Sequence, residues 1–225
     1  MPTDARSAVL AAIRSANGRA TDLSQAELDA AQFARTYTQH SSLSHEETLA
    51  LLGERLVDYD AQIISCTADQ VPSAIRNALQ FHNARRVLIP PDFPARLLPI
   101  GFEIAPDNNL SPADLDRFDA AVTLGALAIA ETGTIILEGV SGQGRRAATL
   151  VPDVHVCIVS AHDVVASVPE AFARLAPAAT LPLTFFSGPS ATADIEMTRI
   201  KGVHGPRHLH ILLLHDSGAT GDETL

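Results

Sequence analysis

The sequence is poor in cysteine, and this scarcity argues against several kinds of metal centre. Only two cysteines, Cys66 and Cys157, occur in 225 residues, and both stand in apolar, strand-like segments. Iron–sulfur clusters and structural zinc sites usually take several thiolate ligands from neighbouring cysteines. We therefore expect two buried free thiols and no such centre in this chain, with a reactive pair or a disulfide as the alternative.

Positive charge, aromatic side chains and long apolar runs are also scarce. Lys and Arg number 16 against 26 Asp and Glu, and the net charge of −10 argues against a nucleic-acid surface. Aromatic residues make up 4%, so the core must consist mainly of Leu, Ile, Val and Ala. No apolar run reaches the roughly 18 residues that span a bilayer. The acidic Asp4 and an amphipathic pattern are unlike a signal peptide, so we expect a cytoplasmic protein.

Alternating strand and helix patterns predict the fold class. Short connections join these segments, which favours an α/β fold with a mostly parallel sheet covered by helices on both faces. The expected strands are 62–66, 86–90, 102–104, 120–124, 134–137, 154–159, 183–186 and 209–214, and the expected helices are 45–58, 69–83, 111–117 and 163–175.

The ends of the chain differ from this central pattern. Residues 1–44 contain one helix-like stretch, 4–17, followed by a polar irregular segment, so we expect an N-terminal helical extension that packs on a neighbour. A capping box of Ser44 and Glu47 begins the α/β domain, 45–216. Residues 217–225 are expected to form a flexible tail.

The first candidate site is a lone carboxylate inside a long uncharged stretch. Glu131, Thr132 and Gly133 separate two apolar, strand-like runs. Because a carboxylate is costly to bury without a partner, we take Glu131 as a candidate catalytic residue, with Thr132 and Gly133 beside it in a binding site. Alternatively, Glu131 lies in water at a strand end and only supports the turn.

A glycine loop with two arginines follows the next strand. Gly142 and Gly144 give it conformational freedom, and the guanidinium groups of Arg145 and Arg146 can bind a carboxylate or phosphate through paired hydrogen bonds. Either arginine could instead neutralise Glu131. The alternative is a hairpin tip with solvated arginines.

A serine- and glycine-containing loop follows the strand at 183–186. Residues 192–200 are expected to form a short helix whose first amides would bind an anion, although a capped helix without a ligand is the alternative. The candidate contacts here are Ser187, Gly188, Ser190, Asp194 and Glu196.

The last candidate loop contains a histidine between two glycines. His204 could act as an acid–base group or anion contact, with Gly205 beside it, although a structural role is the alternative. The spacing of His204, His208 and His210 fits no helical metal pair, so we predict no metal site. The sequence has no nucleophile elbow, Walker loop or GxGxxG motif, which disfavours serine hydrolases, P-loop NTPases and Rossmann dehydrogenases.

Three sequence blocks together resemble the LUD-domain family. They are AETGTIIL at 130–137, GQGRRAATLVPDVHVCIV at 142–159 and TFFSGPSATADIEMTRIKGVHGP at 184–206, which cover about a fifth of the chain. The resemblance implies a fold similar to that of sugar-phosphate isomerases, CoA-transferases and 5-formyltetrahydrofolate cyclo-ligase. It also implies a role in oxidising L-lactate to pyruvate together with iron–sulfur partner proteins, which would hold the clusters that this chain lacks the cysteines to bind.

The same resemblance defines the site residues that we carry forward. The positions that match family blocks are Glu131, Thr132, Gly133, Arg145, Arg146, Ser187, Gly188, Ser190, Asp194, Glu196, His204, Gly205 and Pro206. We predict a lactate-utilisation subunit in which Glu131, the two arginines and His204 line one pocket for a small anion at strand ends. The alternatives are a non-catalytic scaffold or regulatory subunit, and an independent enzyme acting on CoA esters or sugar phosphates. A homo-oligomer is compatible with each.

Overall fold

The computed structural model describes residues 5–16, 37–178, 180–193, 199–201 and 205–216. The chain divides into two compact units, Met1–Thr38 and Gln39–Leu225. The first unit contains the expected N-terminal helix, α1 (Ala5–Ala16), which buries none of its residues. The predicted tail, 217–225, lies outside the described residues.

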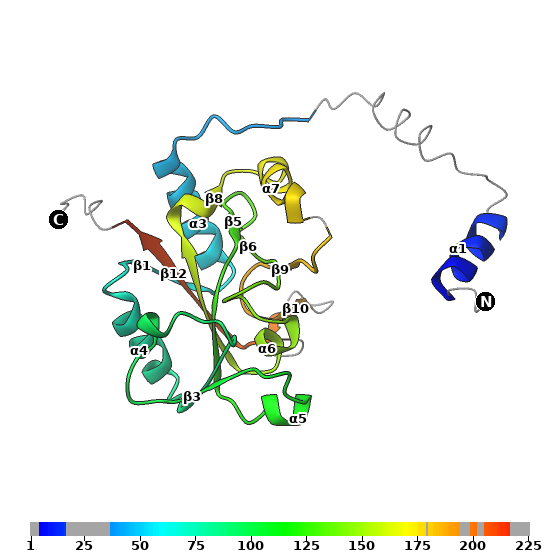
Figure 1. Ribbon diagram of the computed structural model, residues 1–225. Helices are drawn as coiled ribbons and strands as arrows, with labels where there is room; N and C mark the ends of the chain where they lie inside the picture. The colour runs from blue at the N-terminus through cyan, green and yellow to red at the C-terminus, as the bar shows by residue number, and fades with distance from the viewer. Residues whose placement is uncertain (1–4, 17–36, 179, 194–198, 202–204, 217–225) are drawn as a thin grey trace. The chain divides into compact units, whose positions relative to one another are not determined.

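A six-stranded parallel sheet forms the centre of the second unit (Figure 1). All five neighbouring strand pairs are parallel, and the strand order is β1-β12-β7-β4-β2-β3. This confirms the predicted fold class. The strands are β1 (Gln62–Thr67), β2 (Arg86–Ile89), β3 (Glu103–Pro106), β4 (Ala120–Leu124), β7 (Val154–Ser160) and β12 (His208–His215).

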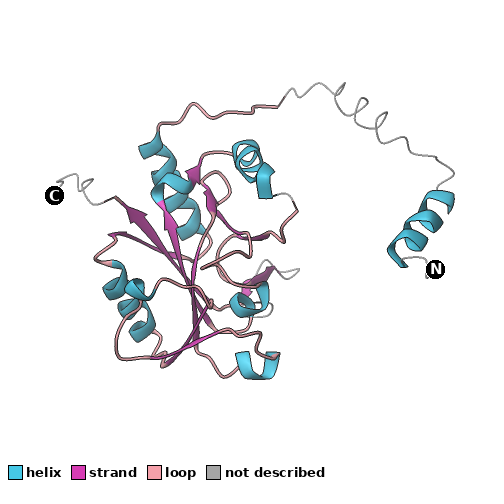
Figure 2. Cartoon of the chain, viewed as in Figure 1, coloured by secondary structure: helices cyan, strands magenta, loops and turns pink. Residues whose placement is uncertain are grey.

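Helices cover both faces of this sheet (Figure 2). Alternate residues of β12 show the two faces, because Leu212 packs in the cluster that contains α4 (Val71–Phe81), whereas Ile211 and Leu213 pack in the cluster that contains α3 (His45–Asp58). Ser44 and Glu47 form the predicted capping box at the start of α3. The α-helices are α3 (His45–Asp58), α4 (Val71–Phe81), α5 (Pro112–Leu115), α6 (Arg146–Leu150) and α7 (Val168–Leu175), with short 3-10 helices η1 (Ala95–Leu97), η2 (Ala161–Asp163) and η3 (Ala176–Ala178).

A second, four-stranded sheet packs beside the first, and it was not expected from the sequence. Its order is β8-β5-β6-β9, formed by β8 (Val164–Val165), β5 (Leu127–Ile129), β6 (Thr134–Leu137) and β9 (Thr184–Phe186). The chain passes from β4 into β5 at Gly125, where a Cβ atom would lie 2.7 Å from Val159 Cγ2. Glycine is therefore needed for the close passage between the two sheets.

Two predicted helices differ from the structure. The helix expected at 163–175 begins only at Val168, because β8 and a second capping box, formed by Ser167 and Glu170, come first. The helix expected at 192–200 is wrong: β10 (Ala191–Ala193) and β11 (Arg199–Lys201) pair as antiparallel strands. The β-branched residues Thr192 and Ile200, which are paired in this hairpin, favour strand over helix.

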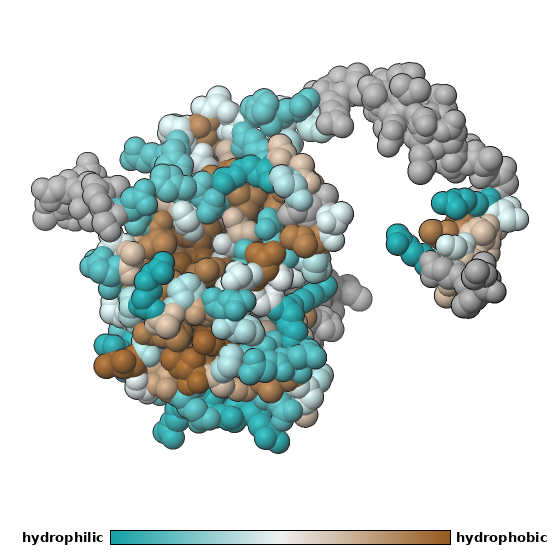
Figure 3. Space-filling model, viewed as in Figure 1, coloured by the Kyte–Doolittle hydropathy of each residue, from teal (hydrophilic) through white to brown (hydrophobic). Residues whose placement is uncertain are grey.

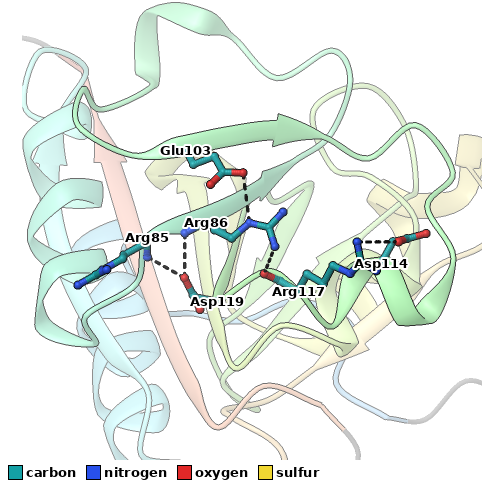
Figure 4. Close-up of polar contacts among 6 residues, drawn as sticks. All are labelled: Arg85, Arg86, Glu103, Asp114, Arg117 and Asp119. Atoms are coloured by element: carbon teal, nitrogen blue, oxygen red, sulfur yellow. Dashed lines mark hydrogen bonds and ion pairs between the residues drawn. The ribbon is translucent and has the colours of Figure 1, made fainter.

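A polar network fixes the amino-terminal ends of β2, β3 and β4 (Figure 4). One carboxylate oxygen of Asp119 accepts hydrogen bonds from the backbone N–H groups of Arg85 and Arg86, both at 2.8 Å. Arg86 in turn donates to Glu103 and to the carbonyl of Arg117. These arginines serve the framework of the sheet, so they are not candidates for the anion site.

No described helix is long and apolar enough to cross a membrane.

Candidate functional site

Arg145 lies at the start of α6 and is held by a buried aspartate. Its Nε donates to Asp107 Oδ2 at 2.7 Å and its Nη2 donates to Asp107 Oδ1 at 3.0 Å, while Nη2 also donates to the carbonyl of Leu110 at 2.6 Å. The Asp107 side chain is 2% exposed and that of Arg145 is 36% exposed. The hydrogen bond to Asp107 raises the pKa of Arg145, so the guanidinium stays charged.

This paired arginine lines a cavity of about 290 Å³, which we call the Arg145 cavity. It lies beyond the carboxyl ends of β2, β3 and β4, where ligands of parallel α/β sheets commonly bind. Gly142 and Gly144 have positive φ, and a Cβ at Gly142 would lie 2.7 Å from Leu124 Cδ1. The residues that line the cavity are Pro90, Pro91, Asp92, Asp107, Asn109, Gly139, Val140, Ser141, Gly142, Gly144 and Arg145.

The geometry leaves one end of the arginine for a ligand. Of the five N–H groups of Arg145, the one on Nε and the two on Nη2 have acceptors among the described residues, and the two on Nη1 have none. Asp92 adds a carboxylate to the same lining. The cavity therefore offers both a cationic donor pair and a hydrogen-bond acceptor. Arg146 is exposed on α6 and lines none of the cavities described here.

The structure does not bring Glu131 and Arg145 together. Glu131 is exposed at the tip of the hairpin formed by β5 and β6, whereas Gly142 and Arg145 follow at its base, where Leu124 N–H donates to the Gly142 carbonyl. The partner of Arg145 is Asp107, and no hydrogen bond or ion pair joins the Glu131 side chain to another described residue. Glu131 is thus a solvated turn residue here, and its catalytic role stays a prediction.

Gly133, in the same turn, has a structural reason to be glycine. It has φ +59°, and a Cβ atom there would lie 2.9 Å from Arg55 Cβ of α3. This close approach fixes the hairpin tip against the helix.

A second cavity, of about 220 Å³, gathers the serine–glycine loop, and we call it the His155 cavity. It contains four of the predicted contacts, together with a buried histidine that sequence reasoning missed. Its lining is Thr149, Leu150, His155, Thr184, Phe186, Ser187, Gly188, Pro189, Ser190, Gly205 and Pro206.

His155 is the ionisable side chain among the residues that line this cavity. It is buried, and its Nε2 lies 2.9 Å from Thr123 Oγ1. Burial lowers its pKa to about 4, so the imidazole is neutral at physiological pH. The available signal was a single histidine within the otherwise apolar strand pattern of VHVCIV, and it was interpreted only as part of the strand.

A third cavity, of about 340 Å³, contains Thr132 and adjoins the second. Phe186 and Ser187 line both cavities. Thr134 Oγ1 lies 2.7 Å from Thr132 Oγ1 and 2.7 Å from Ser187 Oγ, so a chain of three hydroxyls connects the hairpin to β9. The structure thus joins Thr132 with Ser187, which are 55 positions apart in the numbering, and separates both from Arg145.

Three candidate residues, His204, Asp194 and Glu196, lie outside the described residues. His210, described on β12, instead meets His82 and His208: His82 Nε2 lies 2.8 Å from His210 Nε2, and the rings of His82 and His208 stack at 4.1 Å. Within the described part of the chain, no group of three or more His, Cys, Asp or Glu side chains has an arrangement that could hold a metal ion.

Both cysteines are free and buried, as predicted. Burial raises the pKa of Cys66, and it raises the pKa of Cys157 to about 12. Neither thiol is therefore a reactive thiolate at neutral pH.

Comparisons with known proteins give the family. A model of the LUD domain matches residues 112–214. Lactate utilization protein C of Deinococcus radiodurans is 44% identical over 181 residues, which cover 79% of this chain and 84% of that protein. The protein of the same name in Geobacillus thermodenitrificans is 25% identical over an alignment of 235 residues, gaps included, which covers 94% of this chain and 96% of that protein.

A solved structure agrees with these matches. The crystal structure of a DUF162 family protein from Deinococcus radiodurans matches with a TM-score of 0.67 and 41% identity, covering 76% of this chain and 99% of that one. Identity at this level over most of both chains shows common descent and a common fold. The chain therefore belongs to the LUD-domain family and, within it, to the group of lactate utilization protein C.

Proposed function

We propose that this chain is a subunit of a cytoplasmic L-lactate utilisation system that oxidises L-lactate to pyruvate. The observation that carries the proposal is the 44% identity to a lactate utilization protein C over 84% of that protein. The oxidation releases two electrons, and the chain has only two cysteines, both buried single thiols, which cannot supply the four ligands of a typical iron–sulfur cluster. We therefore assign the iron–sulfur clusters to partner subunits.

The Arg145 cavity is our candidate for the site of a small carboxylate. Nη1 of Arg145 has two donors for a carboxylate oxygen, and Asp107 fixes the orientation of the guanidinium. Asp92 opposes a simple anion but can accept a hydrogen bond from a hydroxyl group. A 2-hydroxycarboxylate such as L-lactate satisfies both groups, because it combines a carboxylate with a hydroxyl donor.

The experiment is L-lactate-dependent dye reduction by a tagged chain purified gently from its own host with its partners. Arg145→Lys keeps the positive charge but loses the planar fork that Asp107 holds, so we expect a several-fold rise in the lactate concentration that gives half-maximal rate. Arg146→Lys is the matched control, because Arg146 is exposed and lines none of the three cavities. Equal kinetics for the two variants, at equal partner recovery, would refute the assignment of the carboxylate site.

A non-catalytic scaffold or regulatory subunit is the rival function, and Glu131 distinguishes it. The exposed Glu131 side chain has no hydrogen-bond or ion-pair partner among the described residues, so the Glu131→Ala variant should fold normally. Loss of lactate oxidation in this variant, with partners still recovered, would support a chemical role for the carboxylate. Normal oxidation in both Glu131→Ala and Arg145→Lys would favour a scaffold.

An independent enzyme is the second rival. In that case the purified chain alone would turn over a CoA ester or a sugar phosphate. Such turnover, with no requirement for partners or lactate, would replace our first choice.

A further inference from the structure

The third cavity is walled by phenylalanines in a chain that has few aromatic residues. Three of the eight phenylalanines of the sequence line it: Phe172 from α7, and Phe185 and Phe186 from β9. We call it the phenylalanine cavity. Figure 3 shows brown, apolar atoms reaching the surface in the region where Figure 1 places α7 and β9. The full lining is Ile129, Thr132, Thr134, Val168, Phe172, Phe185, Phe186 and Ser187.

Two of these rings stand open to solvent at the rim. Phe172 is 57% exposed and Phe185 is 43% exposed. Their ring centroids lie 6.1 Å apart with an interplanar angle of 20°, so the two rings are nearly parallel. Exposed aromatic surface is unfavourable in water, and it is most readily covered by another flat apolar surface that stacks on it.

Hydroxyl groups form the polar side of the cavity. Thr132, Thr134 and Ser187 form the chain with two oxygen–oxygen distances of 2.7 Å. Three hydroxyls supply three donors, and the two bonds of the chain use only two of them. One O–H donor therefore remains, together with lone pairs, for a ligand. Because no lining residue of this cavity carries a formal charge, burial of a charged ligand there would be unfavourable.

From this arrangement we propose that the phenylalanine cavity binds the planar, uncharged ring system of a small molecule that carries carbonyl or ring-nitrogen acceptors. One face of the ring packs against the exposed surfaces of Phe172 and Phe185, and an acceptor on its edge accepts a hydrogen bond from the O–H donor that the three hydroxyls leave free. The volume of about 340 Å³ lies within the range of about 300–1,000 Å³ that small-molecule sites occupy.

This site is independent of the carboxylate site proposed above. The residues of the phenylalanine cavity come from α7, β9 and the β5–β6 hairpin, and none of them lines the Arg145 cavity. Ring binding therefore needs neither lactate nor a partner protein, and failure of either proposal leaves the other standing.

The test uses the purified full chain with lumiflavin, an uncharged tricyclic ring that carries carbonyl and ring-nitrogen acceptors. Lumiflavin is fluorescent, and the chain has no tryptophan whose emission would interfere, so the fluorescence anisotropy of the ligand reports its binding. We expect saturable binding of one molecule per chain, weakened by about tenfold in the double variant Phe172→Leu and Phe185→Leu, which keeps apolar bulk but loses the stacking faces. Ser187→Ala should weaken binding by several-fold, because Thr134 Oγ1 loses one of its two hydroxyl partners and the remaining O–H donor is no longer held in one orientation.

The matched control is Phe81→Leu, which makes the same chemical change at a phenylalanine that is 70% exposed on α4, outside this cavity. Lumiflavin affinity should be unchanged in this variant. Absence of saturable binding, or equal weakening by Phe81→Leu, would overturn the proposal. Self-association of the chain that is lost in the double variant, without ring binding, would identify the surface as a protein contact and would also overturn it.

Discussion

Acid should destabilise the protein through two histidines that the core keeps neutral. His155 on β7 is 2% exposed and His210 on β12 is 1% exposed. Burial lowers the pKa of each to about 4, and the neighbouring His82 and His208 contribute to the shift at His210. The corresponding pKa in the unfolded chain is about 6.5.

The sign of the effect follows from proton binding. Between pH 6.5 and pH 4 the unfolded chain binds more protons at these two positions than the folded chain does. The contribution of these two histidines to the free energy of unfolding is therefore nearly constant above about pH 7.5 and falls as the pH decreases toward pH 4.

The pKa values also set the size of the loss. For a group with pKa about 4 in the folded state and about 6.5 in the unfolded state, linkage gives a loss of about 2 kcal/mol between pH 8 and pH 5. The two histidines together contribute about 4 kcal/mol, or about 3 kcal/mol if each folded-state pKa were one unit higher. This is a large share of the roughly 5–15 kcal/mol that stabilises a typical domain.

Urea unfolding followed by far-UV circular dichroism, at pH 8, 7, 6 and 5 and constant ionic strength, measures this loss. His155→Gln and His210→Gln should each remove about half of it, whatever they do to stability at pH 8. His162→Gln is the control, because His162 is exposed and its pKa is raised by Asp216, so its substitution should leave the fall in place. Two results would refute the reasoning: equal stability of the unmodified protein at pH 8 and pH 5, or an undiminished fall in stability between these pH values in both His155→Gln and His210→Gln.

Three substitutions test the packing around the candidate sites. Gly188→Ala should cost at least about 2 kcal/mol, because φ is +77° and the new Cβ would lie 2.7 Å from the Tyr59 carbonyl oxygen; an unchanged urea midpoint would contradict this. Gly53→Ala should stabilise by about 0.5–1 kcal/mol in a thermal scan, since α3 is open at this position and alanine favours helix. Arg145→Met should lower the free energy of unfolding by about 2–3 kcal/mol, measured by urea unfolding, because it leaves the buried Asp107 carboxylate without its partner. The expected loss is smaller than the about 3–5 kcal/mol of a fully buried pair, since water reaches the exposed side of Arg145. A loss under about 1 kcal/mol would show that the pair contributes little.

The pockets show why the candidate residues could not be grouped from sequence alone. Gly142 and Arg145 are three positions apart in the same loop, and both line one cavity because a short loop keeps its residues close together. Glu131 is only 14 positions from Arg145, yet the β5–β6 hairpin places the two at its opposite ends. Antiparallel pairing, which depends on register rather than on distance along the chain, decided this separation.

The sequence by itself determined the class of the fold. Strand-like segments separated by helical ones are diagnostic of a parallel α/β sheet, because parallel strands need a crossover between them. Local chemistry also determined the start of α3, since the bonds between Ser44 and Glu47 lie within one turn of helix. The two buried thiols followed in the same way from the apolar strands around them.

Only the tertiary structure decided which polar groups meet. Asp107 was not a candidate, because nothing in its local sequence shows that its carboxylate will be buried against Arg145, 38 positions away. His155 was taken for an ordinary strand residue, and its role at a cavity wall depends on a loop from β9 that packs over it. The hydroxyl chain of Thr132, Thr134 and Ser187 needs β6 and β9 to be neighbours, and the pairing of those strands is set by the packing of the whole second sheet rather than by either segment alone.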